Sequence, residues 1–514
     1  MRQRPCLVIS LCILLLFSAC SSGSAPANSV APTYSTSPHS PSYDPPVDYS
    51  GNFTYDKGQA DGVVGGGERY LVIGENHAVA AEEDSTLTFS LKADTASYTN
   101  VARYLKNGSL PPHDAVRIEE FINYFSYDTE MSFEYDAPFA LYTEVGISPF
   151  SADRQMVFVR MKTRKIEKED LPASNLTFLI NTSGSMNSHD KLPLLKEAFG
   201  LLVNTLGEDD IVSVVTYADN TTIVLDSVSG TDKPAIQNAI DNLSGGGSTS
   251  GADGIMTAYA LAEKNLLKGG NNRVVLATDG DFNAGVSDTD ALADLVAKKR
   301  GNGVYLSVLG FGAGNIRDDA METLSNYGNG DYHYLSSLDA AKKVLVNELG
   351  TNLFTVATDV KAQIEFNPEL VKSYRLIGYE SSRLIAGDFE DDSKGDGEVG
   401  ADTDLVMMFE LELSDSVFEE RLFDVRIRYK EPGEEVSKLI TRPVFADPEH
   451  NESDDFLFAC SVAAFGHLLR NSDYLGNASL ESTIFLAQKS LGTDHSGRRL
   501  EYLTLLKQYE SLVK

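Results

Sequence analysis

Between about residues 172 and 352 the sequence alternates short apolar runs with amphipathic stretches, and no other feature constrains the fold as strongly. The expected strands begin at Leu176, Ile211, Arg273 and Val304. Their length and branched apolar residues are typical of strands buried on both faces. Helical periodicity is expected at 191–206, 251–268, 288–301, 316–326 and 338–349. This order predicts an α/β fold: a doubly wound, mainly parallel, Rossmann-like sheet with helices on both faces.

Polar residues stand where two of these strands end. The first strand leads into Asn181-x-Ser183-x-Ser185, and the third leads into Asp279. A glycine-rich segment between them, Gly-Gly-Gly-Ser-Thr-Ser-Gly, adds the hydroxyl of Thr249. Ligands of parallel sheets bind at the carboxyl ends of the strands, and hard cations prefer oxygen ligands. Asn181, Ser183, Ser185, Thr249 and Asp279 are therefore candidate metal ligands.

This pattern resembles the metal-ion-dependent adhesion site of the von Willebrand factor type A (VWA) domain, which reads Asp-x-Ser-x-Ser, then Thr, then Asp. The resemblance implies a bound Mg²⁺, Mn²⁺ or Ca²⁺ that the serines contact directly and the first Asp holds through water. Here Asn181 replaces that Asp, so one of two carboxylates is missing. A unit charge pair at about 4 Å contributes roughly 4 kcal/mol at an effective dielectric near 20. We expect a weakened metal site; the alternative is a degenerate turn that keeps only small polar residues.

Residues 1–20 resemble a bacterial lipoprotein signal peptide. Two arginines precede an apolar stretch from Leu7 to Phe17 that is too short to span a bilayer. The stretch leads into Cys20, which cleavage would leave amino-terminal and lipidated; the alternative is an ordinary secretory signal. Either signal predicts export, and lipidation predicts an anchor in the cell membrane or outer membrane. Residues 21–68 are rich in Ser, Pro and Gly and are expected to form a disordered tether.

Three further regions flank the α/β segment. Residues 69–171 are expected to form a mixed α/β region, 353–445 a β-sandwich-like domain, and 446–514 a small helical carboxyl-terminal domain. Alternating residues within 133–161 are candidates to complete the sandwich. A helix at 113–127 is expected to bury one apolar face. That face comprises Val116, Ile118, Phe121, Ile122 and Phe125.

Short phrases along the chain resemble a family of bacterial VWA-domain lipoproteins, in the same order. They include DTASY before the α/β segment and FNPELVKSYRLIGYE after it. The resemblance covers the chain from about residue 80 to its carboxyl end. It implies protein binding at the cell envelope that depends on a metal.

Charge and motif content narrow the function. The formal net charge of −32 argues against nucleic-acid binding and against a basic membrane-docking face. No catalytic residues are nominated, because the sequence contains neither G-x-S-x-G, H-E-x-x-H nor a P-loop motif. The acidic segment 388–404 lacks the spacing of a calcium loop and is expected to be a solvated turn. Cys460 is interpreted as a buried small hydrophobe, and His189 as a solvated loop residue.

We therefore expect a protein-binding module and not an enzyme. A cation with an open coordination position would accept a carboxylate from an unknown envelope or extracellular protein. Two alternatives stay open: a structural envelope scaffold whose metal site has decayed, and a subunit of an envelope hydrolase.

Overall fold

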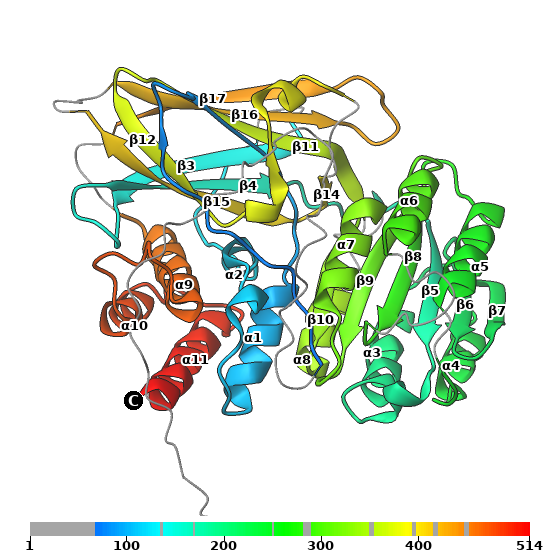
Figure 1. Cartoon of the computed structure of the whole chain (residues 1–514). Helices are drawn as coiled ribbons and strands as arrows, with labels where there is room; N and C mark the ends of the chain where they lie inside the picture. Colours follow the sequence, from blue (N-terminus) through cyan, green and yellow to red (C-terminus); the bar gives the residue numbers. More distant parts are fainter. Residues whose placement is uncertain are drawn as a thin grey trace, which may run out of the picture. The chain divides into compact units, whose positions relative to one another are not determined.

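The computed structural model describes most of the chain after residue 66 (Figure 1). The described ranges are 67–133, 137–167, 170–248, 251–280, 289–348, 354–392, 397–414, 420–446 and 452–514. The signal peptide, Cys20, residues 21–66 of the tether and Thr249 lie outside these ranges. The predictions made for them therefore remain predictions. Glu68, predicted as the last residue of the disordered tether, is instead buried and bonded to Arg103, so the ordered chain begins before the predicted boundary.

A six-stranded sheet forms the centre of the α/β segment. In spatial order its strands are β10 (Tyr332–Leu335), β9 (Tyr305–Phe311), β8 (Asn271–Thr278), β5 (Ser174–Asn181), β6 (Ile211–Tyr217) and β7 (Thr221–Ser229). All neighbouring strands are parallel except the pair β6 and β7. The central strands β5 and β8 are buried along their whole length. The predicted mainly parallel sheet is confirmed.

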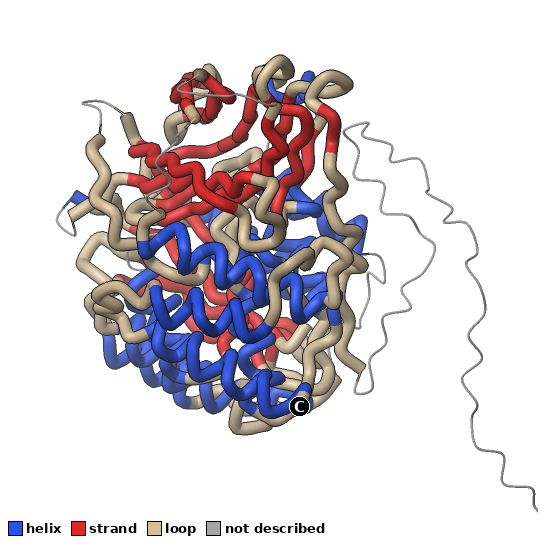
Figure 2. The backbone as a smooth tube through the Cα atoms, turned by 90° about the vertical axis from the view of Figure 1, so that its left-hand side faces the viewer, coloured by secondary structure: helices blue, strands red, loops and turns tan. Residues whose placement is uncertain are grey.

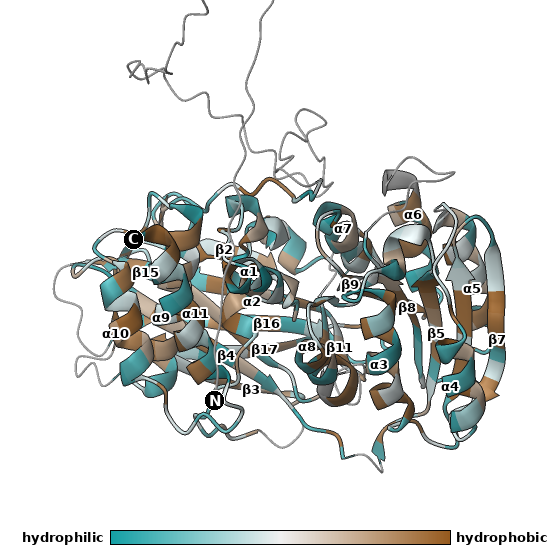
Figure 3. Ribbon diagram, turned by 90° about the horizontal axis from the view of Figure 1, so that it is seen from below, coloured by the Kyte–Doolittle hydropathy of each residue, from teal (hydrophilic) through white to brown (hydrophobic). Residues whose placement is uncertain are grey.

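Helices cover both faces of this sheet. One face carries α3 (Leu192–Val203), α4 (Lys233–Asp241) and α8 (Leu338–Lys342), which continues as a π-helix to Glu348. The other face carries α5 (Gly251–Lys264), α6 (Thr289–Arg300) and α7 (Asp318–Gly328). Neighbouring residues of β5 serve different cores, since Phe178 packs against the first group and Leu179 against the second. Figure 3 shows the strands running between α6 and α7 on one side and α3 and α4 on the other.

Two antiparallel sheets form a β-sandwich. The first contains, in spatial order, β1 (Val79–Ala80), β12 (Val371–Ile377), β15 (Asp404–Leu413), β4 (Gln155–Thr163) and β3 (Phe139–Ile147). The second contains β13 (Arg383–Leu384), β2 (Thr86–Ser90), β11 (Thr355–Phe366), β16 (Arg421–Lys430) and β17 (Lys438–Phe445), with β14 (Glu398–Gly400) paired to β11. Apolar side chains of both sheets share one core. Figure 2 shows these strands in red.

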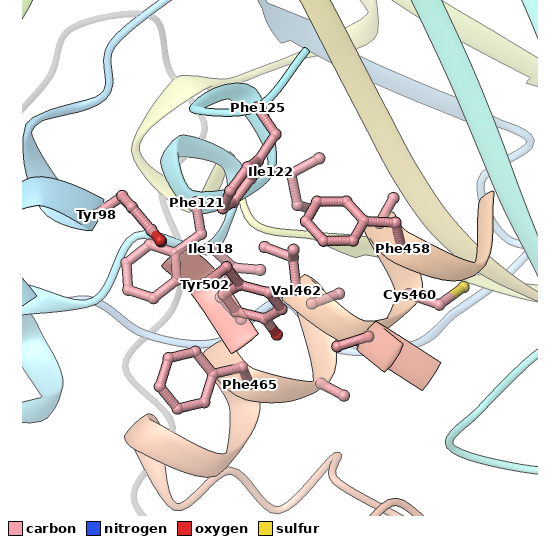
Figure 4. Packing of buried hydrophobic residues seen from close by; sticks show 14 of the residues in the cluster. Tyr98, Ile118, Phe121, Ile122, Phe125, Phe458, Cys460, Val462, Phe465 and Tyr502 are labelled. Atoms are coloured by element: carbon pink, nitrogen blue, oxygen red, sulfur yellow. The ribbon is translucent and has the colours of Figure 1, made fainter. Parts of the chain in front are cut away.

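The carboxyl-terminal helices share a core with helices from the amino-terminal region (Figure 4). These helices are α9 (Asp454–Arg470), α10 (Leu480–Lys489) and α11 (Arg498–Val513), together with α1 (Ala96–Lys106) and α2 (Ile118–Asn123). The ring of Phe125 lies 4.9 Å from that of Phe458 and 5.6 Å from that of Tyr502, measured between centroids. The apolar face expected at 113–127 is buried here, although the α-helix itself is shorter. Cys460 is buried in the same core, as expected.

The chain is divided differently from the predicted domains. The sequence suggested one region at 69–171. Its strands β3 and β4, within 133–161, complete the sandwich as predicted, and β2 joins the sandwich as well. Its helices α1 and α2 pack with the carboxyl-terminal helices instead. Periodicity identifies an element and its apolar face, whereas the core that buries that face is chosen by contacts distant in sequence.

The acidic segment 388–404 is also more engaged than a solvated turn. Glu390 and Asp392 pair with Arg428 at 2.7 and 3.0 Å, and Asp404 pairs with Arg160 at 2.7 Å. The Glu390 side chain is 61% exposed, as expected for a solvated turn, but that of Asp404 is only 12% exposed. Asp404, the last residue of the segment, thus links strand β15 to Arg160 of strand β4 within the sandwich.

A buried charge cluster joins the amino-terminal region to the α/β segment. The Arg117 guanidinium, 2% exposed, lies 2.6 Å from Asp318 and 3.7 Å from Glu322, both on α7, and it also contacts Glu120 on α2. Carboxylates outnumber the guanidinium, so some of them are neutral near neutral pH. Burial raises the pKa of the Glu120 carboxyl to about 8, although Arg117 opposes the rise.

This cluster predicts a loss of stability at alkaline pH. The folded-state pKa of Glu120 lies above its ordinary value of 4.5, so its contribution is present below that value and lost as pH rises through about 8. We expect the melting temperature to fall between about pH 6 and pH 9, and Glu120→Gln to flatten that slope. Thermal unfolding at several pH values across this range measures the slope of melting temperature against pH. Glu197→Gln, at an exposed position of α3, is the control and should keep the parental slope. Equal slopes in all three proteins would contradict the assignment.

Candidate functional site

Parallel pairing of β5 with β8 brings two candidate ligands together. The register aligns Ile180 with Ala277. Asn181, the last residue of β5, and Asp279, directly after β8, therefore reach the same edge of the sheet. The Asn181 side-chain amide donates a hydrogen bond to Oδ1 of Asp279 at 3.0 Å, and both residues are fully buried. The predicted proximity of these two residues is confirmed.

The loop after β5 folds back onto Asn181. The backbone N–H of Ser183 donates to Oδ1 of Asn181 at 2.9 Å, so both ends of the Asn181 amide are used within the site. The hydroxyls of Ser183 and Ser185 lie 3.0 Å apart. Ser183 is buried and Ser185 is exposed. Four of the five candidate ligands thus converge, and the fifth, Thr249, is not among the described residues.

The glycine-rich loop that begins at Gly245 contacts the loop after β5, here called the serine loop because it carries Ser183 and Ser185. The N–H of Gly184 donates to the carbonyl of Gly247 at 3.0 Å. Asp219, after β6, accepts hydrogen bonds from the backbone N–H and the hydroxyl of Ser248 at 2.7 and 2.6 Å. Gly247 has φ of +78°, and a Cβ there would lie 2.3 Å from Oδ2 of Asp219, so this turn requires glycine. Ser248, the residue directly before Thr249, is therefore held in place by its two hydrogen bonds to Asp219.

A lysine that the sequence analysis did not nominate occupies the centre of the site. Lys191, the N-cap residue of α3, places its ammonium 2.9 Å from Oδ2 of Asp279. It also donates to Oδ1 of Asn315 at 2.8 Å, and the Asn315 amide donates to Oδ2 of Asp279 at 3.0 Å. Lys191 is 5% exposed. The carboxylate of Asp279 is thus bonded on Oδ1 by Asn181 and on Oδ2 by Lys191 and Asn315.

The loop after β9 makes room for this lysine. Gly312 has φ of +79°, and a Cβ there would lie 2.1 Å from Cε of Lys191 and 2.5 Å from its Cγ. The hydroxyl of Tyr334 donates to the carbonyl of Gly312 at 2.6 Å. Glu68 accepts a hydrogen bond from the N–H of Gly314 at 2.7 Å, so the amino-terminal region fastens the same loop.

Asp279 is ionised despite its burial. Burial by itself would raise the pKa of the Asp279 carboxyl. The Lys191 ammonium and hydrogen bonds from Asn315 and Ser185 outweigh that effect, so its pKa lies below the ordinary value. The site holds a buried ion pair of Lys191 and Asp279.

As arranged, the candidate ligands do not fit a divalent cation. Asp279 supplies the one carboxylate among them, and Lys191 already neutralises it. The Asn181 amide directs its N–H group toward that carboxylate. No cluster of three or more His, Cys, Asp or Glu side chains suited to a metal occurs within the described ranges. A divalent cation would have to displace the ammonium from its partner. The expected Mg²⁺, Mn²⁺ or Ca²⁺ remains a prediction of the VWA resemblance.

The sequence contains only weak signals for Lys191 and Asn315, the two site residues that were not predicted. Lys191 stands directly before an amphipathic helix, where a lysine is ordinarily solvated. Its one sequence signal is indirect: replacing an Asp by Asn181 leaves Asp279 as the single carboxylate. Asn315 directly follows Gly310-x-Gly312-x-Gly314 at the end of β9, and nothing in that pattern marks the asparagine as a partner of Asp279. His189 is exposed in the serine loop, as expected.

Gly312→Ala is predicted to disrupt the buried ion pair. The added methyl would overlap the Lys191 stem, whereas Gly314→Ala adds a methyl with no atom within 4 Å at a similar positive φ of +92°. Backbone strain is matched, so the difference between the two variants reports the clash. We expect Gly312→Ala to lose roughly 1–3 kcal/mol more unfolding free energy than Gly314→Ala. Chemical denaturation measures this, and equal losses would mean that Lys191 does not lie against Gly312.

Comparisons with known proteins identify families that match parts of this chain. Residues 175–347 match the family described as "von Willebrand factor type A domain", and residues 65–158 match one described as "von Willebrand factor". Residues 351–512 match "Uncharacterized protein YfbK, C-terminal". A solved structure of a von Willebrand factor type A protein from Catenulispora acidiphila is similar at 14% identity and a TM-score of 0.44, covering 73% of this chain and 91% of that one.

Two relatives extend the comparison in sequence. The protein sll0103 of Synechocystis is 25% identical over 282 residues, which are 52% of this chain and 64% of that protein. The protein YfbK of Escherichia coli K12 is 40% identical over 467 residues, which are 86% of this chain and 81% of YfbK. The chain therefore belongs to the YfbK family of VWA-domain proteins.

Proposed function

We propose that this chain is a non-enzymatic, extracytoplasmic protein-binding module, anchored to the cell membrane or outer membrane by a lipid on Cys20. Its contact surface is formed by the loops at the carboxyl edge of the VWA sheet. One observation supports this proposal. The exposed polar loops at that edge lie next to a buried network in which Asn181, Lys191 and Asn315 all hydrogen-bond to Asp279.

The exposed part of the edge comes from two loops. Gly184, Ser185, Asn187, Ser188 and His189 are exposed in the loop after β5. Gly246–Ser248 are exposed in the glycine-rich loop. Asn187 links the two loops by donating to the carbonyl oxygens of Gly184 and Gly245 at 3.3 and 3.2 Å. Loops held on a rigid scaffold lose little conformational entropy when a partner binds.

The partner proposed is an envelope or extracellular protein that presents a carboxylate. Ser185 is exposed, and its hydroxyl can donate a hydrogen bond to such a group. In the VWA resemblance a metal would mediate this contact. The strong acidity of the chain disfavours nucleic acid as the partner.

Anchoring is assigned to Cys20 on sequence grounds. The cysteine stands three residues after Phe17, the last residue of the short apolar stretch of the signal. Among the described residues, none of the helices has both the length and the apolar character needed to cross a bilayer.

Site-specific photocrosslinking in cells tests the contact surface. A photoreactive amino acid at His189, exposed on the carboxyl edge, is expected to yield a discrete adduct with a second protein. The same amino acid at Lys268, exposed in the loop that precedes β8 at the opposite end of the sheet, should not yield that adduct. An adduct from Lys268 alone, or the same adduct from both positions, would remove the carboxyl edge as the contact surface.

Cys20→Ser tests the anchor. Because a thioether-linked lipid requires the thiol, this variant is expected to move from the membrane fraction to the soluble fraction after cell breakage. Cys460→Ser is the matched control and should stay with the membranes, since that cysteine is buried in the helical core. Continued membrane association of Cys20→Ser under high salt would contradict a lipid anchor.

A further inference from the structure

We propose that Lys191 serves as a built-in cation at the position where a VWA adhesion site would use a divalent metal. The carboxyl edge is then assembled without metal. The inference concerns how the edge is held together, and it does not depend on the partner proposed above.

The contacts of the ammonium are those expected of a resident cation. Lys191 bonds the carboxylate of Asp279 at 2.9 Å and the amide oxygen of Asn315 at 2.8 Å. Both ligands are oxygen atoms, and the lysine is almost fully buried. An ammonium ion can donate three hydrogen bonds, so it substitutes for a cation as a charge and as a link between loops. Here it links the loops that follow β8 and β9 to the start of α3.

The charges of the site balance with a lysine. Two carboxylates and one divalent cation, the combination implied by the adhesion motif, sum to zero. In this chain Asn181 removes one negative charge, leaving the single carboxylate of Asp279. One ammonium restores neutrality, whereas a divalent cation in addition to Lys191 would leave two uncompensated positive charges in a buried site. Uncompensated buried charge is strongly unfavourable.

The surrounding backbone is shaped for the lysine stem. Gly312 is the residue against which Cγ, Cδ and Cε of Lys191 lie, and any larger residue there would collide with them. Tyr334 and Glu68 hold this glycine loop in place through hydrogen bonds to Gly312 and Gly314. A solvated lysine would need no such groove. The position of Asn315, bonded to both Lys191 and Asp279, completes the enclosure.

The Asn181 side-chain amide is oriented as expected for a site that contains a single positive charge. Its N–H group donates to Asp279, and its oxygen accepts from the N–H of Ser183. An aspartate at this position could not donate to Asp279, and two carboxylates in contact would repel each other without a stronger cation between them. Asparagine at 181 and lysine at 191 are thus complementary features of one site.

The first test uses the unaltered protein. We expect purified protein to contain no stoichiometric metal by elemental analysis. Its melting temperature should be the same in EDTA and in about 5 to 10 mM Mg²⁺ or Mn²⁺, several times above the roughly 1 mM dissociation constants of weak calcium sites in proteins. Calorimetric titration should show no saturable binding. One equivalent of bound metal, or a melting temperature that rises with Mg²⁺, would overturn the proposal.

The second test converts the site. The double variant Lys191→Met, Asn181→Asp removes the ammonium, keeps an unbranched apolar stem and restores the second carboxylate. We expect this variant to gain saturable Mg²⁺ binding at least roughly tenfold tighter than the parent, and a melting temperature that rises with Mg²⁺. Asn181→Asp alone should gain less, because the ammonium still occupies the position. An equal gain from Asn181→Asp alone would show that Lys191 does not compete with the metal.

The controls separate this effect from general loss of charge. Lys264→Met removes the lysine of an exposed ion pair with Asp226 and should change neither metal binding nor melting temperature beyond about 1 °C, as is usual for surface pairs. If the double variant does not fold, the titration of the parent and of Asn181→Asp still decides the question.

Discussion

Parallel pairing of β5 with β8 sets the position of all the polar chemistry described above. Both strands are buried on two faces, so sliding one past the other would expose apolar residues and bury polar ones. The register that avoids this puts Asn181 and Asp279 at one edge, within a hydrogen bond of each other. Lys191 and Asn315 both bond Asp279, and the loop that carries Ser183 bonds Asn181.

The VWA domain of this chain is built into its surroundings. Arg117 on the amino-terminal side is buried against Asp318 of α7, and Glu68 bonds the loop that carries Gly312 and Asn315. Removing one partner of a buried pair leaves a charge without compensation, at a typical cost of about 3–5 kcal/mol. The amino-terminal region therefore does more than connect the tether to the VWA domain, because it holds the loop that encloses the lysine.

Buried charges in this protein follow one rule in two places. In the Arg117 cluster the carboxylates exceed the cation, and the pKa of Glu120 rises to about 8. At the carboxyl edge one ammonium meets one carboxylate, and the pKa of Asp279 lies below its ordinary value. The difference follows from local stoichiometry, since a buried carboxyl group ionises readily only when a cation is at hand. The net charge of −32 therefore says little about any individual site.

The sequence by itself determined the α/β sheet, the period-two strands of the sandwich and the edge where Asn181, Ser183, Ser185 and Asp279 meet. Those features depend on periodicity and on residues adjacent to strand ends, which are local properties. Tertiary structure alone decided that helices α1 and α2 pack with the carboxyl-terminal helices, and that Lys191 neutralises Asp279. These two residues are 88 positions apart, and the groove at Gly312 that admits the lysine comes from a third segment. No local pattern specifies such a contact, because a lysine before a helix has the same sequence whether it is solvated or enclosed.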